Sequence, residues 1–153
     1  MAGTYTRIYI HCVFAVRARE NLLQKPWRDE VFSYMAGIIY SKNQKPFIVN
    51  GVEDHVHILL GYTPTTILPD LIRDIKNNSS KFINERGFME TTFAWQRGYG
   101  AFSCGHSQLD RIYQYILNQE EHHLRKTFRN EYLRLLKRYD VNYDSRYVFD
   151  RED

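Results

Sequence analysis

Residues 53–60 read Glu-Asp-His-Val-His-Ile-Leu-Leu, and this stretch decides how the rest of the chain can be arranged. Two histidines flank one valine, and the run then becomes fully apolar. In a β-strand alternate side chains point to opposite faces, so His55 and His57 would share one face and Val56 would lie on the other. Two imidazoles one pleat repeat apart form a platform for a divalent ion, although a sheet can carry two histidines without that role. The pair is therefore a candidate metal site that other segments have to complete.

Length and composition place the chain among single-domain globular proteins. Its 153 residues predict one domain over residues 1–153, long enough to bury a core without disulfides. Aromatic residues reach 15%, with 12 Tyr and 9 Phe, a composition that suits interfaces and base stacking. The formal charge of +3 permits nucleic-acid binding without requiring it. We find no signal peptide and no apolar run of transmembrane length, so we expect a cytoplasmic protein that does not associate with membranes.

Hydrophobic periodicity predicts an α+β fold. The expected order is β-α-β-β-α-β followed by further helices, which is the ferredoxin-like split arrangement with an antiparallel sheet. Asn50-Gly51 is a turn signal between the second and third strands, which indicates a hairpin. The predicted strands cover residues 4–17, 46–52, 54–62 and 92–104, and the predicted helices cover 27–42, 66–87, 107–126 and 128–138, with an extended end after them.

The helix predicted over 107–126 carries a second candidate pair. Ser107 is a possible N-cap for this helix. Tyr115 and Gln119 are four residues apart and would stand on one helical face, where a phenol oxygen and an amide oxygen can address one point. Tyr113 would point elsewhere. Most exposed helical tyrosines have no chemical role, so this pair gains meaning only together with the histidines.

Taken together, these motifs resemble a known family, the single-tyrosine HUH transposases of the insertion-sequence-200-like (200/605) group. HUH denotes histidine, a bulky apolar residue and histidine, which here is His55-Val56-His57. Residues 95–103, Trp-Gln-Arg-Gly-Tyr-Gly-Ala-Phe-Ser, are similar to the segment that precedes the family's tyrosine helix. Residues 115–123, Tyr-Ile-Leu-Asn-Gln-Glu-Glu-His-His, are similar to that helix. The likeness extends from the first strand to about His123, and the residues beyond it match less distinctively.

The resemblance implies a mechanism. Tyr115 would be the nucleophile that forms a 5′-phosphotyrosine link to single-stranded DNA, cut near hairpins at the ends of a mobile element. His55, His57 and Gln119 would hold one divalent ion, which would polarise the scissile phosphate. The family implies Mg²⁺ or Mn²⁺, whereas two imidazoles alone would suggest a softer ion such as zinc.

The resemblance also implies a homodimer with shared active sites. The tyrosine helix of one subunit would complete the histidine site of the other, so His55 and His57 would work with Tyr115 of the neighbouring subunit. Gln119 would belong to the subunit that supplies Tyr115, because both lie on one helix.

Several polar residues are candidates for supporting roles. We expect Asp54 to point away from His55 by strand phase, which disfavours an orienting role, and we expect His11 to be structural. For the basic candidates for a contact with DNA the default is solvated surface, and for His122 the alternative is a structural role near the end of its helix. These candidates are Arg73, Lys76, Lys81, Arg97 and His122.

Three alternatives to a self-mobile transposase remain open at this point. A domesticated relative would cut similar hairpins without mobilising itself. A metal-dependent hydrolase would activate water and leave Tyr115 incidental. A non-catalytic module would bind single-stranded nucleic acid on the same scaffold.

Overall fold

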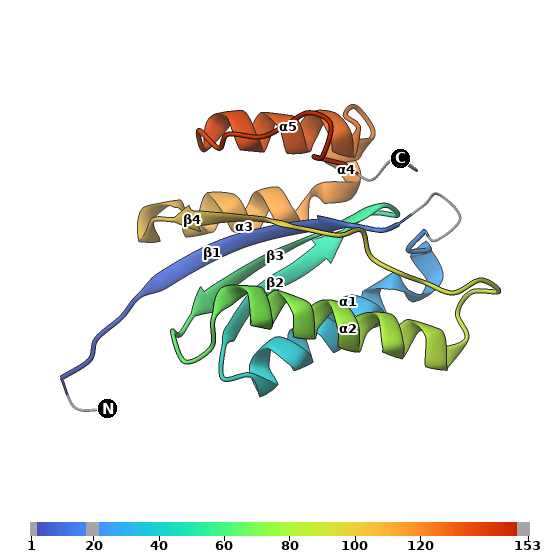
Figure 1. Cartoon of the computed structure of the whole chain (residues 1–153), viewed down its shortest axis with the longest axis horizontal. Coiled ribbons are helices and arrows are strands. Elements are labelled where there is room, and N and C mark those ends of the chain that lie inside the picture. The colour runs from blue at the N-terminus through green and yellow to red at the C-terminus, as the bar shows by residue number, and fades with distance from the viewer. Residues whose placement is uncertain (1–2, 18–21, 150–153) are drawn as a thin grey trace.

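A four-stranded antiparallel sheet forms the centre of the computed structural model, which describes residues 3–17 and 22–149. The sheet has the order β2-β3-β1-β4. This arrangement confirms the predicted α+β, ferredoxin-like βαββαβ order (Figure 1). The strands are β1 (Ile8–Ala15), β2 (Lys45–Gly51), β3 (His55–Tyr62) and β4 (Gly100–Cys104).

Two long helices, α1 (Lys25–Ser41) and α2 (Leu68–Arg86), cover one face of the sheet. Each has a proline in its first turn, where the missing N–H costs nothing. Val56, Ile58 and Leu60 of β3 point to this side and are completely buried in the main core. The apolar half of the β3 alternation therefore anchors the sheet to these two helices.

The C-terminal helices cover the opposite face, so the sheet lies between two helical layers (Figure 1). After a short 3₁₀ turn, η2 (His106–Gln108), they are α3 (Leu109–Leu117), α4 (Gln119–His123) and α5 (Phe128–Arg138). Ile116 of α3 packs against Leu59, and Leu135 of α5 belongs to a cluster with Val13. Thr127 caps α5, because its side chain accepts a hydrogen bond from the Asn130 N–H. These helices cover the face that carries the histidines.

The single helix predicted over 107–126 is interrupted at Asn118. The Asn50 side-chain amide donates hydrogen bonds to the carbonyls of Ile116 (2.9 Å) and Leu117 (3.2 Å). Because Asn50 satisfies the end of α3, the chain can turn before α4 begins. Ser107 lies within η2 and is not the N-cap of α3, so that prediction was wrong.

The strand predicted over 92–104 is also shorter, because only its last five residues form β4. Before β4, Trp95 pairs with Val16 in a single antiparallel bridge, and side chains of α2 bind the backbone on either side of it. The Asn84 side chain pairs with both the N–H and the carbonyl of Phe93, and the Lys76 amine donates to the carbonyls of Gln96 and Gly98. The strand pattern of this segment therefore reflects burial against α2.

The predicted hairpin between β2 and β3 is present, but Asn50 and Gly51 do not form its turn. Both residues still belong to β2, with Asn50 paired to His57 and Gly51 to Val56, and the chain reverses over residues 52–54. A Cβ atom at residue 51 would lie 2.2 Å from the His55 carbonyl oxygen. Glycine is therefore needed at this position for close backbone approach beside the histidines.

Candidate active site and metal centre

His55 and His57 lie side by side on the β3 face that α3, α4 and α5 cover. Both side chains are fully buried, and β3 has a neighbouring strand on each side. Their ring centroids are 5.0 Å apart. The alternation in the sequence correctly predicted that these rings share one face, and the sheet holds them in a fixed mutual geometry.

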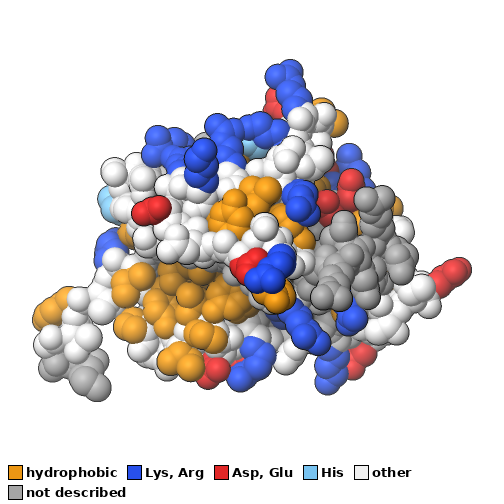
Figure 2. All heavy atoms as spheres, turned by 45° about the horizontal axis from the view of Figure 1, so that its top comes forward, with side chains coloured by type: hydrophobic (Ala, Val, Ile, Leu, Met, Phe, Trp, Pro, Cys, Tyr) orange, Lys and Arg blue, Asp and Glu red, His pale blue; other side chains and the backbone are white. Residues whose placement is uncertain are grey.

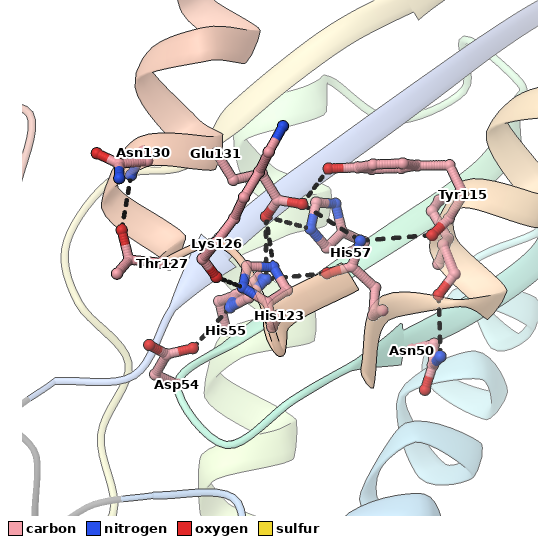
Figure 3. A network of polar contacts seen from close by, with 12 residues as sticks. Asn50, Asp54, His55, His57, Tyr115, His123, Lys126, Thr127, Asn130 and Glu131 are labelled. Atoms are coloured by element: carbon pink, nitrogen blue, oxygen red, sulfur yellow. Dashed lines mark hydrogen bonds and ion pairs between the residues drawn. The ribbon is translucent and has the colours of Figure 1, made fainter. Parts of the chain in front are cut away.

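A carboxylate on α5, that of Glu131, meets both histidines (Figure 3). Glu131 Oε1 lies 3.1 Å from His55 Nε2 and 3.0 Å from His57 Nε2, and these three residues form a group that could hold a metal ion. His123 Nε2 also approaches Oε1, at 3.2 Å. One buried carboxylate oxygen therefore faces three imidazoles, an arrangement that offsets the cost of burying its charge.

Tyr115 lies on the other side of the same carboxylate. Its hydroxyl donates a hydrogen bond to Glu131 Oε2, and its ring stands perpendicular to that of His57 with centroids 5.7 Å apart (Figure 3). Gln119 is fully buried and bridges His55 and Glu131. Its Oε1 accepts from His55 Nε2 at 3.1 Å, and its Nε2 donates to Glu131 Oε2 at 3.3 Å. The structure thus brings together all four residues that the sequence assigned to the centre, within a single chain.

The second ring nitrogen of each histidine is also held. His55 Nδ1 donates to Asp54 Oδ1 at 2.7 Å, and His57 Nδ1 shares a hydrogen bond of 2.8 Å with His11 Nε2. The expectation that Asp54 points away was wrong, because Asp54 precedes β3 and strand phase does not apply to it. His11 is buried as expected, but it contacts a site residue. Outer contacts of this kind fix the orientation and tautomer of metal-binding histidines.

Glu131 is the site residue that the sequence analysis missed. It lies beyond the segment that carried the resemblance, and 74 positions separate it from His57. A signal was nevertheless present. Phe128, Glu131 and Leu135 fall at helical spacing, which places a carboxylate on the apolar face of the predicted helix. A charge in that position indicates a buried partner.

Burial and charge shift the pKa values of the centre in opposite directions. Burial lowers the pKa of His57 to about 4 and that of His11 to about 3, so both are neutral near pH 7. Burial opposes charge on His55 too, but its bonds to Asp54 and Glu131 prevail and raise its pKa to about 9. Burial disfavours the charged form of Glu131, yet hydrogen bonds from His123, His55 and His57 outweigh it and hold that pKa far below the usual range.

The pKa of Tyr115 is raised well above its usual value. Burial is the main cause, and the negative charge of Glu131 adds to it. The hydroxyl is therefore protonated at physiological pH and is a weak nucleophile by itself. Chemistry at Tyr115 needs a substrate that is activated in another way, and the adjacent imidazole and carboxylate donors could hold an ion that does so.

The five residues predicted to contact DNA lie in two different places. Arg73, Lys76 and Lys81 are on α2, across the sheet from Tyr115, with Arg73 paired to Asp70 and Asp74 and Lys81 to Glu85. Arg97 is exposed in the segment before β4. Only His122 lies at the centre, where its ring centroid is 4.8 Å from that of Tyr115.

A comparison with known protein families matches the part of the chain that holds the two histidines, Tyr115 and Gln119. The family described as "Transposase IS200 like" matches residues 4–119, which include His55, His57, Tyr115 and Gln119. The chain belongs to this family. The family thus identifies the chain as a transposase, a DNA-cleaving enzyme. Its match ends before α5, so Glu131 lies outside the matched region.

Individual relatives agree with this assignment. The ISDra2 transposase TnpA of Deinococcus radiodurans is 22% identical over 124 residues, covering 78% of this chain and 89% of that protein. A crystal structure of a transposase from the same organism covers 78% of this chain and 95% of its own, with a TM-score of 0.63 and 22% identity. A structure of a REP-associated tyrosine transposase bound to a REP hairpin covers 99% of this chain and 96% of its own, with a TM-score of 0.59 and 14% identity. These likenesses confirm the fold. Among the helices described, none is long and apolar enough to span a membrane.

Proposed function

We propose that this transposase cleaves and rejoins single-stranded DNA through a 5′-phosphotyrosine intermediate, with Tyr115 as the nucleophile. The observation that carries the proposal is the convergence of Tyr115, the two β3 histidines and Gln119 on one buried point. A hairpin is the substrate feature we favour, because a structural relative over nearly the whole chain is bound to one. We expect the protein to act in the cytoplasm.

The donor set of this centre fits a divalent ion. Two imidazole nitrogens, the Glu131 carboxylate and the Gln119 amide oxygen face a common point, and Asp54 and His11 hold the outer ring nitrogens. The hard oxygen donors suit Mg²⁺ or Mn²⁺, and the imidazoles tolerate a softer ion. Such an ion, when bound, neutralises charge on the scissile phosphate.

The chain's own residues perform the remaining tasks. Glu131 Oε2 accepts the hydrogen bond of the Tyr115 hydroxyl and holds that oxygen beside the histidines. In the proposed step Tyr115 Oη attacks phosphorus and gives up its proton to solvent, an O–P bond forms, the bond from phosphorus to the 3′ oxygen breaks, and that oxygen takes up a proton and leaves as a 3′ hydroxyl. The energy of the phosphoester is retained in the link to tyrosine, so another 3′ hydroxyl can reverse the step without ATP. Cleavage and rejoining then use one site.

We also propose that the protein is a homodimer. Each subunit of this dimer can contain a complete centre. The contact between Tyr115 and Glu131, and those of Glu131 with His55 and His57, all lie within one chain. This geometry favours a site completed in cis over the shared arrangement expected from the resemblance.

A matched pair of tyrosine variants tests the proposed nucleophile. Tyr115→Phe removes only the hydroxyl, and Tyr113→Phe makes the same change two residues away on α3. We would incubate each variant with Mn²⁺ or Mg²⁺ and a labelled hairpin whose single-stranded arms are randomised, and then separate denatured protein from free DNA. We expect a covalent adduct with the wild type and Tyr113→Phe, and a loss of several orders of magnitude with Tyr115→Phe.

Two outcomes would contradict the proposal. Cleavage that survives Tyr115→Phe would indicate a hydrolase that uses water. Wild-type protein that binds the hairpin but forms no adduct with either metal would indicate a binding module.

A further inference from the structure

A cleft of about 280 Å³ lies between α3 and α5, and Tyr115 forms part of its wall. Four cations also line it: Arg111 of α3, Lys126 of the loop before α5, and Arg134 and Arg138 of α5. The one acidic residue among its described lining is Glu131, whose carboxylate is already bound to Tyr115 and the histidines. The cleft is therefore strongly positive next to the proposed nucleophile.

These cations differ from many others on the surface. Several basic side chains elsewhere have acidic partners, as in Lys42 with Asp74 and Arg86 with Glu30, whereas others, such as Arg129 and Lys137, have no carboxylate partner among the described residues and do not line the cleft. Within residues 3–17 and 22–149, none of the four cleft cations forms an ion pair with a carboxylate. Figure 2, which brings the side of α5 forward, shows Lys and Arg side chains gathered along the upper edge of the molecule. Unpaired cations that converge on one cleft indicate an anionic partner.

The lining between the cations is apolar and aromatic. Ile112, Leu135 and Tyr139 contribute to the cleft, and the Tyr139 ring is stacked on Phe102. A positive rim around an aromatic floor matches a nucleotide, whose phosphates are charged and whose base has apolar faces. The positive charge of the cleft also acts on Tyr115. Arg134 lowers the pKa of the Tyr115 hydroxyl, although burial raises that pKa by more.

We propose that the cleft between α3 and α5 binds the phosphodiester backbone of single-stranded DNA beside the scissile phosphate. Arg111, Arg134 and Arg138 contact phosphates, and a base of the same strand lies against the apolar floor. This inference rests on the proposed function, since it supplies the path by which a strand reaches Tyr115. It assigns the contacts to helices α3 and α5, across the sheet from the α2 residues predicted from the sequence.

The test compares two double variants that remove equal charge from the same helix. Arg134→Gln/Arg138→Gln changes the cleft. Arg129→Gln/Lys137→Gln changes two α5 cations that do not line it. All four side chains are exposed, so both proteins should fold, which thermal melts would check. The neighbouring single variants Arg138→Gln and Lys137→Gln repeat the comparison if either double variant melts early.

Binding would be measured with a labelled, randomised single-stranded oligonucleotide in EDTA, in the Tyr115→Phe background, so that no cleavage intervenes. Backbone contacts carry no sequence information, which makes a randomised probe suitable. We expect at least tenfold weaker binding for the cleft variant at low salt. The plot of log K against log salt should become less steep by about 1.4, since the variant removes two phosphate contacts and each contributes about 0.7 on a single strand. The control variant should lose much less.

Equal losses in both double variants would show a general charge effect and overturn the proposal. Equal loss of binding to a duplex of the same sequence composition would overturn the assignment to single strands. The binding test needs no chemistry, so its result is separate from that of the adduct assay. A missing adduct with normal cleft-dependent binding would refute the proposed cleavage and leave the cleft assignment intact, and a normal adduct with unchanged binding would refute only the cleft.

Discussion

The two faces of β3 differ in the kind of contact that their side chains make. Val56, Ile58 and Leu60 enter an apolar core against α1 and α2, where each contact is non-directional. His55 and His57, one residue out of phase, enter a polar centre in which nearly every ring nitrogen has a defined partner. The same strand thus supplies stability on one side and chemistry on the other.

This difference determines how each face should respond to mutation. A core position loses packing energy when it is truncated, but the site keeps its geometry as long as the sheet folds. A polar position such as His57 makes directional bonds to His11 and Glu131, and its loss removes a donor that no neighbour replaces. The activity of the folded protein should therefore differ sharply between variants at adjacent residues of one strand.

The largest expected effect comes from a crossed comparison of His57 and Ile58. His57→Ala should reduce formation of the DNA adduct by about 10³-fold in protein that is still folded, because a donor of the proposed metal centre is lost. It should also cost about 1–3 kcal/mol of stability, because it leaves His11 and Glu131 without a buried partner. Ile58→Ala should cost about 2–5 kcal/mol of stability through its cavity, while the folded protein retains activity. Urea titrations and the adduct assay, both at low temperature, measure the two effects.

The opposite pattern would break the comparison between the faces. If Ile58→Ala abolished the activity of folded protein, or if His57→Ala left adduct formation intact, the strand would not divide into a structural and a chemical face.

A smaller effect is a bell-shaped dependence of stability on pH in EDTA. His57 and His11 have folded pKa values of about 4 and 3, below the ordinary 6.5, so stability should rise from about pH 4 to 6.5 as the unfolded chain loses its extra protons. His55 has a folded pKa of about 9, so its contribution is complete below pH 6.5 and is lost as the pH rises through 9. That loss amounts to at most about 3 kcal/mol.

Glu131→Gln sharpens this prediction, because the Glu131 carboxylate is one of the groups that raise the pKa of His55. The variant should have a shallower decline between pH 6.5 and 9 than wild type, measured as urea midpoints. Glu121→Gln, an exposed change on α4, is the control and should keep the wild-type profile. A flat wild-type profile across this range would contradict the described charge arrangement.

The sequence predicted one face of β3 and its neighbours well, because local periodicity reports burial. It also predicted the Phe128–Arg138 helix with the bounds that the structure has. It could not predict where that helix docks, since packing between distant segments leaves no local pattern. Glu131 was missed for this reason, although its place among apolar neighbours was visible.

Other differences have the same physical origin. Asn50 reads as a turn residue, but its amide binds the end of α3 and interrupts the helix that carries Tyr115. Lys76 reads as a surface cation, but its amine binds the backbone before β4. In each case a long-range hydrogen bond overrides a local preference, and the site is assembled largely from such bonds.

Mixing two inactive variants tests most directly whether one chain carries the complete centre. His57→Ala retains Tyr115, and Tyr115→Phe retains the histidines, so each lacks a different part. We expect that the mixture, after dissociation and reassembly, forms no more DNA adduct than the two variants alone. Recovery of adduct in the mixture, attached to the His57→Ala chain, would show that Tyr115 acts on a neighbouring subunit and would contradict this expectation.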